Sequence, residues 1–126
     1  MPGVFEIFVE THFSAAHSLT GYRGNCAQIH GHNWAAEVFV ICRELNNIGI
    51  GIDFRDLKQV IKDTIKDLDH SYLNEHSEFT RINPSSENIA KFLYRELGGK
   101  INSDNLKVSK VKVSESRGAG ACYWEE

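Results

Sequence analysis

Two stretches of this 126-residue chain alternate apolar and polar side chains with a period of two, the pattern of half-buried β-strands. The first spans Phe5–Phe13 and places its acidic residues on the face opposite most of its apolar ones. The second spans Trp34–Cys42 and has the same period. Side chains alternate across a strand, so each stretch predicts a strand with one face toward a core.

Two later segments repeat their apolar residues every three to four positions, which is the period of an amphipathic helix. The first begins at Phe54, directly after Asp53, a residue type that caps helix N-termini. The second begins at Pro84, and we expect it to end at Gly98–Gly99 because glycine commonly terminates helices.

The remaining segments complete the order of elements. Ser71–Asn83 is mostly polar and is expected to be a loop, whereas Val111–Glu115 and Ala121–Trp124 predict two short strands. The order strand, strand, helix, helix, strand, strand (ββααββ) predicts an α+β fold, a four-stranded antiparallel sheet with two helices on one face. We expect one domain over residues 1–126. Helices on one side leave the sheet edges and other face open, so we expect an oligomer whose sheets join.

The net charge, the apolar content and the cysteines indicate which partners and which cellular compartment to expect. A net charge of −3 provides no general attraction to nucleic acids or acidic membranes, and we expect neither as a partner. We find no secretory signal and no apolar run of transmembrane length. The three cysteines are Cys26, Cys42 and Cys122, an odd number without disulfide-like spacing, so we expect reduced thiols and a cytoplasmic protein.

His30 and His32 stand one residue apart at the mouth of the second predicted strand. Such a pair projects to one face, so a single metal ion can contact both. His17 follows the first predicted strand, and pairing of the two strands would bring it close to the pair. Three imidazoles with an open fourth position are typical of catalytic zinc, although they also suit other first-row metals. The alternatives are plain surface histidines, or His12 as third ligand, although His12 lies on the other strand face.

Cys26 lies four residues before His30 and admits three roles. It is a buried packing residue, a fourth ligand of a structural zinc site, or a proton-transfer thiol. A fourth ligand would close the tetrahedron, whereas a catalytic thiolate sits near the metal without binding it. Spacing alone leaves the last two roles open.

Three further polar residues are candidates for a site. Asp69 directly precedes His70, and it either forms a polar helix end with it or holds the imidazole in one tautomer as a proton acceptor. Direct contact between them requires the chain to turn there. Glu115 ends the third predicted strand, where a glutamate is either solvated or accepts two hydrogen bonds from a guanine- or pterin-like ring.

Several motifs occur in one order along nearly the whole chain: Phe13-Ser-Ala-Ala-His17, Cys26-(three residues)-His30-Gly31-His32-Asn33, Ile52-Asp53-Phe54, Leu57-Lys58, Leu68-Asp69-His70, Tyr72-Leu73-Asn74, Pro84-Ser85-Ser86-Glu87-Asn88 and Ser114-Glu115. In these motifs the chain resembles the 6-pyruvoyl- and 6-carboxy-tetrahydropterin synthase family. The resemblance implies the tunnelling fold, in which the sheets of three subunits join into a barrel. Two such trimers stack into a homohexamer with active sites at the subunit interfaces.

The same resemblance implies roles for the candidate residues. His17, His30 and His32 would bind zinc (Zn2+), and Cys26 would be the proton-transfer thiol. Asp69 and His70 would form its partner dyad, and Glu115 would anchor a pterin. Two features depart from the family pattern: Ser85 stands where threonine is common, and the glycine-rich tail Arg117–Cys122 matches no motif.

The implied substrate is 7,8-dihydroneopterin triphosphate. Three residues separate the cysteine from His-Gly-His, as in the queuosine-pathway branch. That branch is a zinc-dependent carbon–carbon lyase, which forms 6-carboxy-5,6,7,8-tetrahydropterin and releases acetaldehyde and triphosphate. One alternative is a 6-pyruvoyl-tetrahydropterin synthase, which eliminates triphosphate and retains the carbons. The other is a non-catalytic, zinc-stabilised oligomeric module with Cys26 as fourth ligand.

Overall fold

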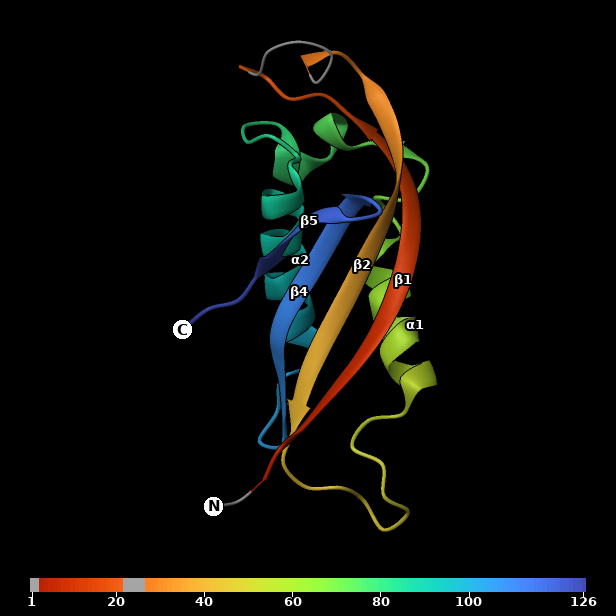
Figure 1. The fold of residues 1–126 in the computed structure, drawn as a ribbon, viewed down its shortest axis with the longest axis vertical. Helices are drawn as coiled ribbons and strands as arrows, with labels where there is room; N and C mark the ends of the chain where they lie inside the picture. The colour runs from red at the N-terminus through yellow and green to blue at the C-terminus, as the bar shows by residue number, and fades with distance from the viewer. Residues whose placement is uncertain (1–2, 22–26) are drawn as a thin grey trace.

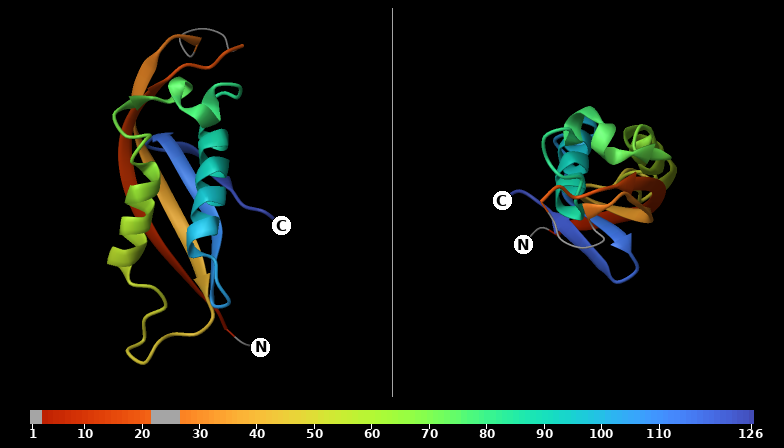
Figure 2. Two further views of the ribbon diagram at one scale, coloured as in Figure 1. Left: turned by 180° about the vertical axis from the view of Figure 1, so that it is seen from behind. Right: turned by 90° about the horizontal axis from the view of Figure 1, so that it is seen from above.

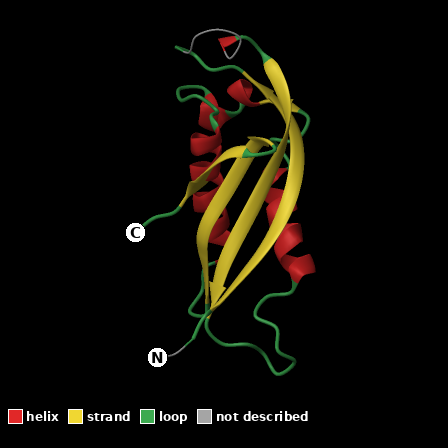
Figure 3. Cartoon of the chain, viewed as in Figure 1, coloured by secondary structure: helices red, strands yellow, loops and turns green. Residues whose placement is uncertain are grey.

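The computed structural model describes residues 3–21 and 27–126. Its strands form one layer, and two helices cover one face of that layer (Figures 1, 2 and 3). The order of strands across the sheet is β3-β1-β2-β4-β5. In chain order the elements are β1 (Phe5–His17), β2 (His30–Cys42), α1 (Phe54–Ile65), β3 (Ser71–Tyr72), two 3-10 turns (Leu73–Glu75 and Ser77–Phe79), α2 (Ser86–Ile101), β4 (Leu106–Ser116) and β5 (Ala119–Tyr123).

β1 and β2 form a long antiparallel hairpin. Phe5 pairs with Cys42 at one end and His17 with His30 at the other. The period of two seen in the sequence is confirmed, because one set of alternate side chains is buried against the helices: Val9, Phe13, Trp34, Val38 and Val40. Both strands extend beyond their alternating apolar stretches toward the loop that connects them. This extension carries the three histidines.

The sheet contains one more strand than the sequence indicated. Ser71–Tyr72 forms β3, which pairs in parallel with Ala15–Ala16 of β1. The sheet is therefore five-stranded and mixed, within the predicted α+β class. The pairing uses backbone groups of two residues in a polar segment, so it leaves no periodic signature in the sequence.

The first helix begins at Phe54 as predicted, whereas the second begins at Ser86, two residues after Pro84, with Ser85 as its N-cap. Asp53 Oδ1 accepts a hydrogen bond from Arg55 N at 2.7 Å, and Ser85 Oγ accepts one from Asn88 N at 3.2 Å. Both helices turn an apolar stripe toward the sheet, and its fully buried members include Leu57, Ile61, Ile89 and Leu93. Pro84, two residues before the second helix, lies next to His17, because its carbonyl oxygen is 2.7 Å from His17 Nδ1.

The prediction that α2 ends at Gly98–Gly99 was wrong. The helix continues to Ile101, and the backbone N–H of Asn102 donates to Gly98 O at 3.0 Å. A glycine within a helix costs only about 1 kcal/mol relative to alanine. Burial of Leu97 and Ile101 in the core outweighs that cost.

The edges of the sheet are largely open. Within the described ranges, β3 pairs with only two residues of β1, which leaves the edge from Phe5 to Phe13 without a strand partner. The uncovered face carries exposed Phe8, whose ring stacks on Phe39 with centroids 5.5 Å apart. Such edges commonly pair with another chain, and the expected oligomer stays a prediction. No helix of the described part is both long and apolar enough to cross a membrane.

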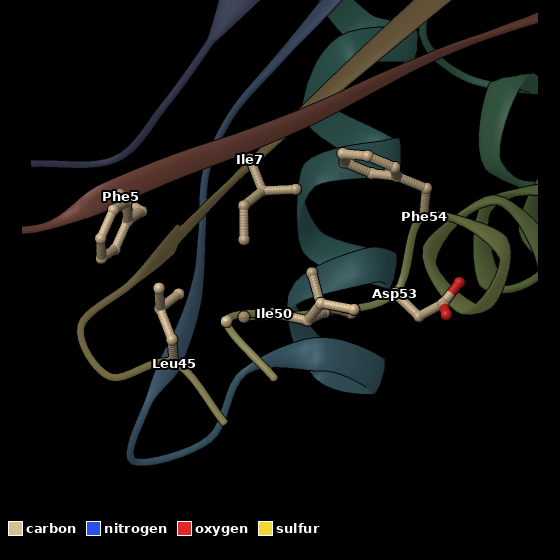
Figure 4. A pocket seen from close by; sticks show the side chains of 9 residues that line it. Phe5, Ile7, Leu45, Ile50, Asp53 and Phe54 are labelled. Carbon is tan, nitrogen blue, oxygen red and sulfur yellow. The ribbon is translucent and has the colours of Figure 1, made fainter. Parts of the chain in front are cut away.

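An apolar pocket of about 350 Å³ lies at the Phe5 end of β1, the opposite end from His17 (Figure 4). Phe5, Ile7, Leu45 and Ile50 are among the side chains around it. Its only ionisable lining residue, Asp53, is engaged in capping α1. Among the described residues, the pocket therefore offers no ionisable side chain that is free for catalysis or metal binding. The candidate site lies at the other end of the sheet.

Candidate metal centre

The pairing of β1 with β2 brings three histidines together at one end of the sheet. His17 stands directly opposite His30, and His32 projects to the same face two residues further along β2. One ligand atom from each residue lies within 4.8 Å of the others. The structure thus groups His17, His30 and His32 in an arrangement that can hold a metal ion. His12, the competing candidate, lies exposed on the other face and pairs with Glu10.

Backbone carbonyls orient two of the imidazoles. Pro84 O lies 2.7 Å from His17 Nδ1, and Gln28 O lies 2.8 Å from His30 Nδ1. A carbonyl oxygen can only accept, so in each ring Nδ1 carries the proton and Nε2 keeps its lone pair. This is the tautomer in which Nε2 can bind a metal.

Two buried nitrogens in this cluster fit a metal ion. Among the described residues, neither His17 Nε2 nor His32 Nε2 has a hydrogen-bond partner. A buried polar atom left unpaired costs about 1–3 kcal/mol. Coordination removes that cost, and three neutral imidazoles are a donor set that zinc and other first-row metals accept.

The environment of His17 keeps its ring neutral. Burial lowers the pKa of His17, and the neighbouring His30 and His32 lower it further, against the hydrogen bond to Pro84 and the charge of Glu115. A neutral imidazole is the form that binds metal, so His17 is ready to coordinate at neutral pH.

Trp34 packs beside the histidines and fixes their positions. Its fully buried ring meets His17 and His32 edge-on, with centroids 4.9 and 5.3 Å apart. Trp34 Nε1 donates a hydrogen bond to Ala15 O at 3.1 Å. The sequence marked Trp34 only as an alternating apolar position of a strand, and such a position carries no signal for contact with a neighbouring site.

Glu115 lies beside the histidines on the inner face of β4. One carboxylate oxygen, Oε2, is 3.6 Å from His32 Nε2 and 3.8 Å from His17 Nε2. The side chain is 39% exposed, so it remains accessible to a ligand. The structure therefore brings Glu115 to the metal centre, and its role as a pterin anchor stays a prediction.

Asp69 and His70 form the expected contact because the chain turns between them. His70 has φ +57°, in the left-handed region that histidine adopts more readily than most residues. Its Nδ1 lies 3.0 Å from Asp69 Oδ1, which also accepts from Ser14 N at 2.9 Å. The backbone N–H of His70 donates to Ser14 O at 2.6 Å, so this pair is attached to the edge of β1.

An open pocket of about 380 Å³ has both His32 and His70 in its lining, together with Ser14, Ala15, Ala16, Gly31, Asn33 and Ser71. The His70 side chain is 83% exposed. The pocket therefore connects the metal centre with the Asp69–His70 pair. Cys26 lies outside the described residues, and its position relative to both stays a prediction.

Replacement of Asp69 by asparagine should lower stability in a pH-dependent way. The N–H of Ser14 and then the nearby His70 depress the pKa of Asp69 in the folded protein. A carboxylate with a depressed pKa contributes stability above its unfolded pKa of about 3.9 and loses it as the pH falls through the folded-state pKa. Because solvent screens this 40% exposed carboxylate, we expect Asp69→Asn to lower the free energy of unfolding by roughly 0.5 kcal/mol at neutral pH, and by less as the pH falls through that window.

Urea unfolding near neutral pH and near pH 3 measures this difference. Asp67→Asn, an exposed carboxylate two residues earlier, is the matched control. An equal loss for Asp69→Asn at both pH values would contradict the argument.

Comparisons with known proteins agree on one family. A family model described as 6-pyruvoyl tetrahydropterin synthase matches residues 6–126. A protein of Archaeoglobus fulgidus, provisionally named 6-carboxy-5,6,7,8-tetrahydropterin synthase, is 38% identical over 87% of this chain and 87% of its own length. The 6-carboxy-5,6,7,8-tetrahydropterin synthase of Bacillus subtilis is 29% identical over 89% of this chain and 78% of its own.

Solved structures share the fold. The chain is similar to Caenorhabditis elegans 6-pyruvoyl tetrahydropterin synthase with a TM-score of 0.85 and 22% identity, covering 98% of this chain and 97% of that one. The Plasmodium vivax 6-pyruvoyl tetrahydropterin synthase has a TM-score of 0.74 and 21% identity, covering 98% and 99%. At these identities the likeness concerns the fold alone.

Proposed function

This chain belongs to the 6-pyruvoyl tetrahydropterin synthase family, and from that membership we propose that it is a 6-carboxy-5,6,7,8-tetrahydropterin synthase. It converts 7,8-dihydroneopterin triphosphate and one water molecule to 6-carboxy-5,6,7,8-tetrahydropterin, acetaldehyde and triphosphate. The observation that carries the proposal is the cluster of three histidines with Glu115 beside it. The names of the Archaeoglobus and Bacillus relatives, and the three residues between Cys26 and His30, support the carboxy branch.

The proposed metal is zinc, held by His17, His30 and His32. The hydrogen bonds from Nδ1 of His17 and His30 leave Nε2 as the ligand atom, and the unpaired Nε2 atoms support the assignment. When bound, zinc supplies a Lewis acid that polarises oxygens of the substrate side chain. Three protein ligands leave a position for those oxygens.

The protein's own residues bind the ring and move protons. The Glu115 carboxylate accepts two hydrogen bonds from the amino-pyrimidinone edge of the pterin, which places the ring next to the histidines. Asp69 accepts from His70 Nδ1, so His70 Nε2 is the nitrogen free to take a proton from the substrate. Cys26 transfers a proton on the opposite side of the bound side chain.

The proposed assembly is a cytoplasmic homohexamer, a dimer of trimers with active sites at the subunit interfaces, in queuosine biosynthesis. The edge of β1 from Phe5 to Phe13, which has no strand partner in the described part of the chain, supports the joining of sheets between subunits. The exposure of His70 supports a site that a neighbouring subunit completes. A monomer in sedimentation experiments at micromolar concentration would contradict this assembly.

A product assay tests the reaction. Zinc-loaded protein is given 7,8-dihydroneopterin triphosphate, and acetaldehyde is followed alongside the mass of the pterin product. We expect acetaldehyde together with a carboxy-tetrahydropterin, and neither from protein stripped of metal by a chelator. A pyruvoyl product without acetaldehyde would replace the proposed reaction with triphosphate elimination. No turnover with zinc bound would favour the non-catalytic module.

A further inference from the structure

Two asparagine side chains hold the segment that follows His17. Asn74 Oδ1 accepts from Ser18 N and Asn74 Nδ2 donates to Ser18 O, both at 2.9 Å. Asn83 makes the same pair of hydrogen bonds with the backbone of Thr20, also at 2.9 Å each. An amide side chain offers one acceptor and two donors, so each asparagine acts as the edge of a neighbouring strand would.

These contacts continue the sheet where its ladder stops. The pairing of β1 with β3 ends at Ala16 and Tyr72. After Tyr72, the segment that forms β3 leaves the edge of β1 and continues as the 3-10 turn Leu73–Glu75. The Asn74 side chain lies in this turn and reaches back to the backbone of Ser18. The Ser18 hydroxyl and Tyr72 OH, 2.8 Å apart, add a further link.

Asn83 also connects this segment to the metal centre. The next residue, Pro84, is buried, and its carbonyl receives the hydrogen bond of His17 Nδ1. The carbonyl of Asn83 itself accepts from Asn88 Nδ2 at 2.8 Å, which ties it to the first turn of α2. One dipeptide, Asn83-Pro84, therefore contacts both His17 and Thr20 from a fixed position on the helix.

We propose that Asn74 and Asn83 are positioning residues of the metal centre. They hold the backbone after His17 so that Nδ1 stays on the Pro84 carbonyl and Nε2 faces the metal. Neither side chain belongs to the group that could hold the metal, so both act through His17. This inference rests on the metal centre of the proposed function, but not on the identity of the pterin product.

The chain offers a matched control at the other end of the sheet. Asn105 Oδ1 accepts from Arg43 N and Glu44 N, at 3.1 and 2.8 Å, and its Nδ2 donates to Glu44 O at 2.7 Å. Asn105 makes the same kind of hydrogen bonds from its side-chain amide to the backbone, but with residues that follow Cys42 at the end of β2. His30 and His32 lie at the start of that strand. Asn105→Ala therefore removes an equivalent side chain without touching the metal centre.

The test compares Asn74→Ala, Asn83→Ala and Asn105→Ala in three measurements. These are Zn2+ affinity by competition with a chelator, the visible spectrum of the Co2+-loaded protein, and urea unfolding of the metal-free protein. Residues that orient a ligand typically change metal affinity by about 10–100-fold when mutated. We expect such a loss and a changed cobalt spectrum for Asn74→Ala and Asn83→Ala. For Asn105→Ala we expect lower stability with unchanged metal affinity.

Wild-type metal affinity and spectrum in Asn83→Ala, whatever its stability, would overturn the proposal. Asn83→Asp keeps the acceptor for Thr20 N and loses the donor, so it should bind metal with intermediate affinity. If Asn83→Ala does not fold, wild-type affinity in Asn83→Asp overturns the proposal. A wild-type protein that binds neither Zn2+ nor Co2+ overturns it as well. Absence of pterin turnover with metal bound overturns only the proposed function.

Discussion

Replacement of His32 by alanine is expected to lower Zn2+ affinity by more than about 100-fold, and to remove turnover with it. Residues that only orient a ligand change metal affinity by about 10–100-fold, so the loss of a ligand itself should exceed that range. His32 is the better test than His17, because its side chain is 22% exposed while His17 is buried. Loss of His32 therefore removes a ligand with little damage to the core.

Equilibrium dialysis and thermal unfolding with and without zinc measure the effect. A ligand at about 100 times its Kd stabilises the folded state by about 2.7 kcal/mol, and this zinc-dependent gain should disappear in His32→Ala. His12→Ala is the matched control, since His12 is 67% exposed on the other face of the sheet. Undiminished zinc binding in His32→Ala, or its loss in His12→Ala, would contradict the assignment of ligands.

Replacement of Cys26 by alanine is expected to reduce turnover by about 10²–10⁴-fold, the usual contribution of a positioned proton-transfer group. Zinc affinity and stability should stay at wild-type values, because a proton-transfer thiol is not a ligand. Steady-state kinetics and zinc titration of the same preparation separate the two effects.

A different result would follow if Cys26 were the fourth ligand. Zinc affinity and thermal stability would then fall together, because metal binding and folding are coupled. The Co2+-loaded wild-type protein would also show thiolate-to-cobalt charge transfer, and Cys26→Ala would lack it. Cys122→Ala, which removes an exposed free thiol, is the control and should keep full turnover.

Local periodicity predicted most of the fold. Alternation marked β1 and β2, and helical periods marked α1 and α2, with Asp53 as the cap of the first and Pro84 near the start of the second. These signals are reliable because each depends on residues within a few positions of one another. The last two strands were found with shifted bounds, since β4 begins at Leu106 and β5 at Ala119.

The errors occurred where packing outweighed local preference. Gly98–Gly99 lie inside α2 because the helix end is held by buried Leu97 and Ile101. The strand Ser71–Tyr72 exists because the open edge of β1 accepts it, and nothing in a polar pair of residues indicates such an edge. Alternation with apolar neighbours predicted that Cys122 is a packing residue, but it lies exposed on the edge strand β5.

By itself the sequence determined that His30 and His32 share one face of a strand, because a period of two is a property of the extended backbone. For the same reason it placed Glu115 on the face of its strand that carries Val111 and Val113. Only the tertiary structure decided which nitrogens face the metal position and what holds them. The hydrogen bonds that hold His17 and the backbone after it join residues 56 to 67 positions apart, from Asn74 to Ser18 and from His17 to Pro84. Those contacts form only once the segment between α1 and α2 reaches the end of β1, and no local pattern encodes that meeting.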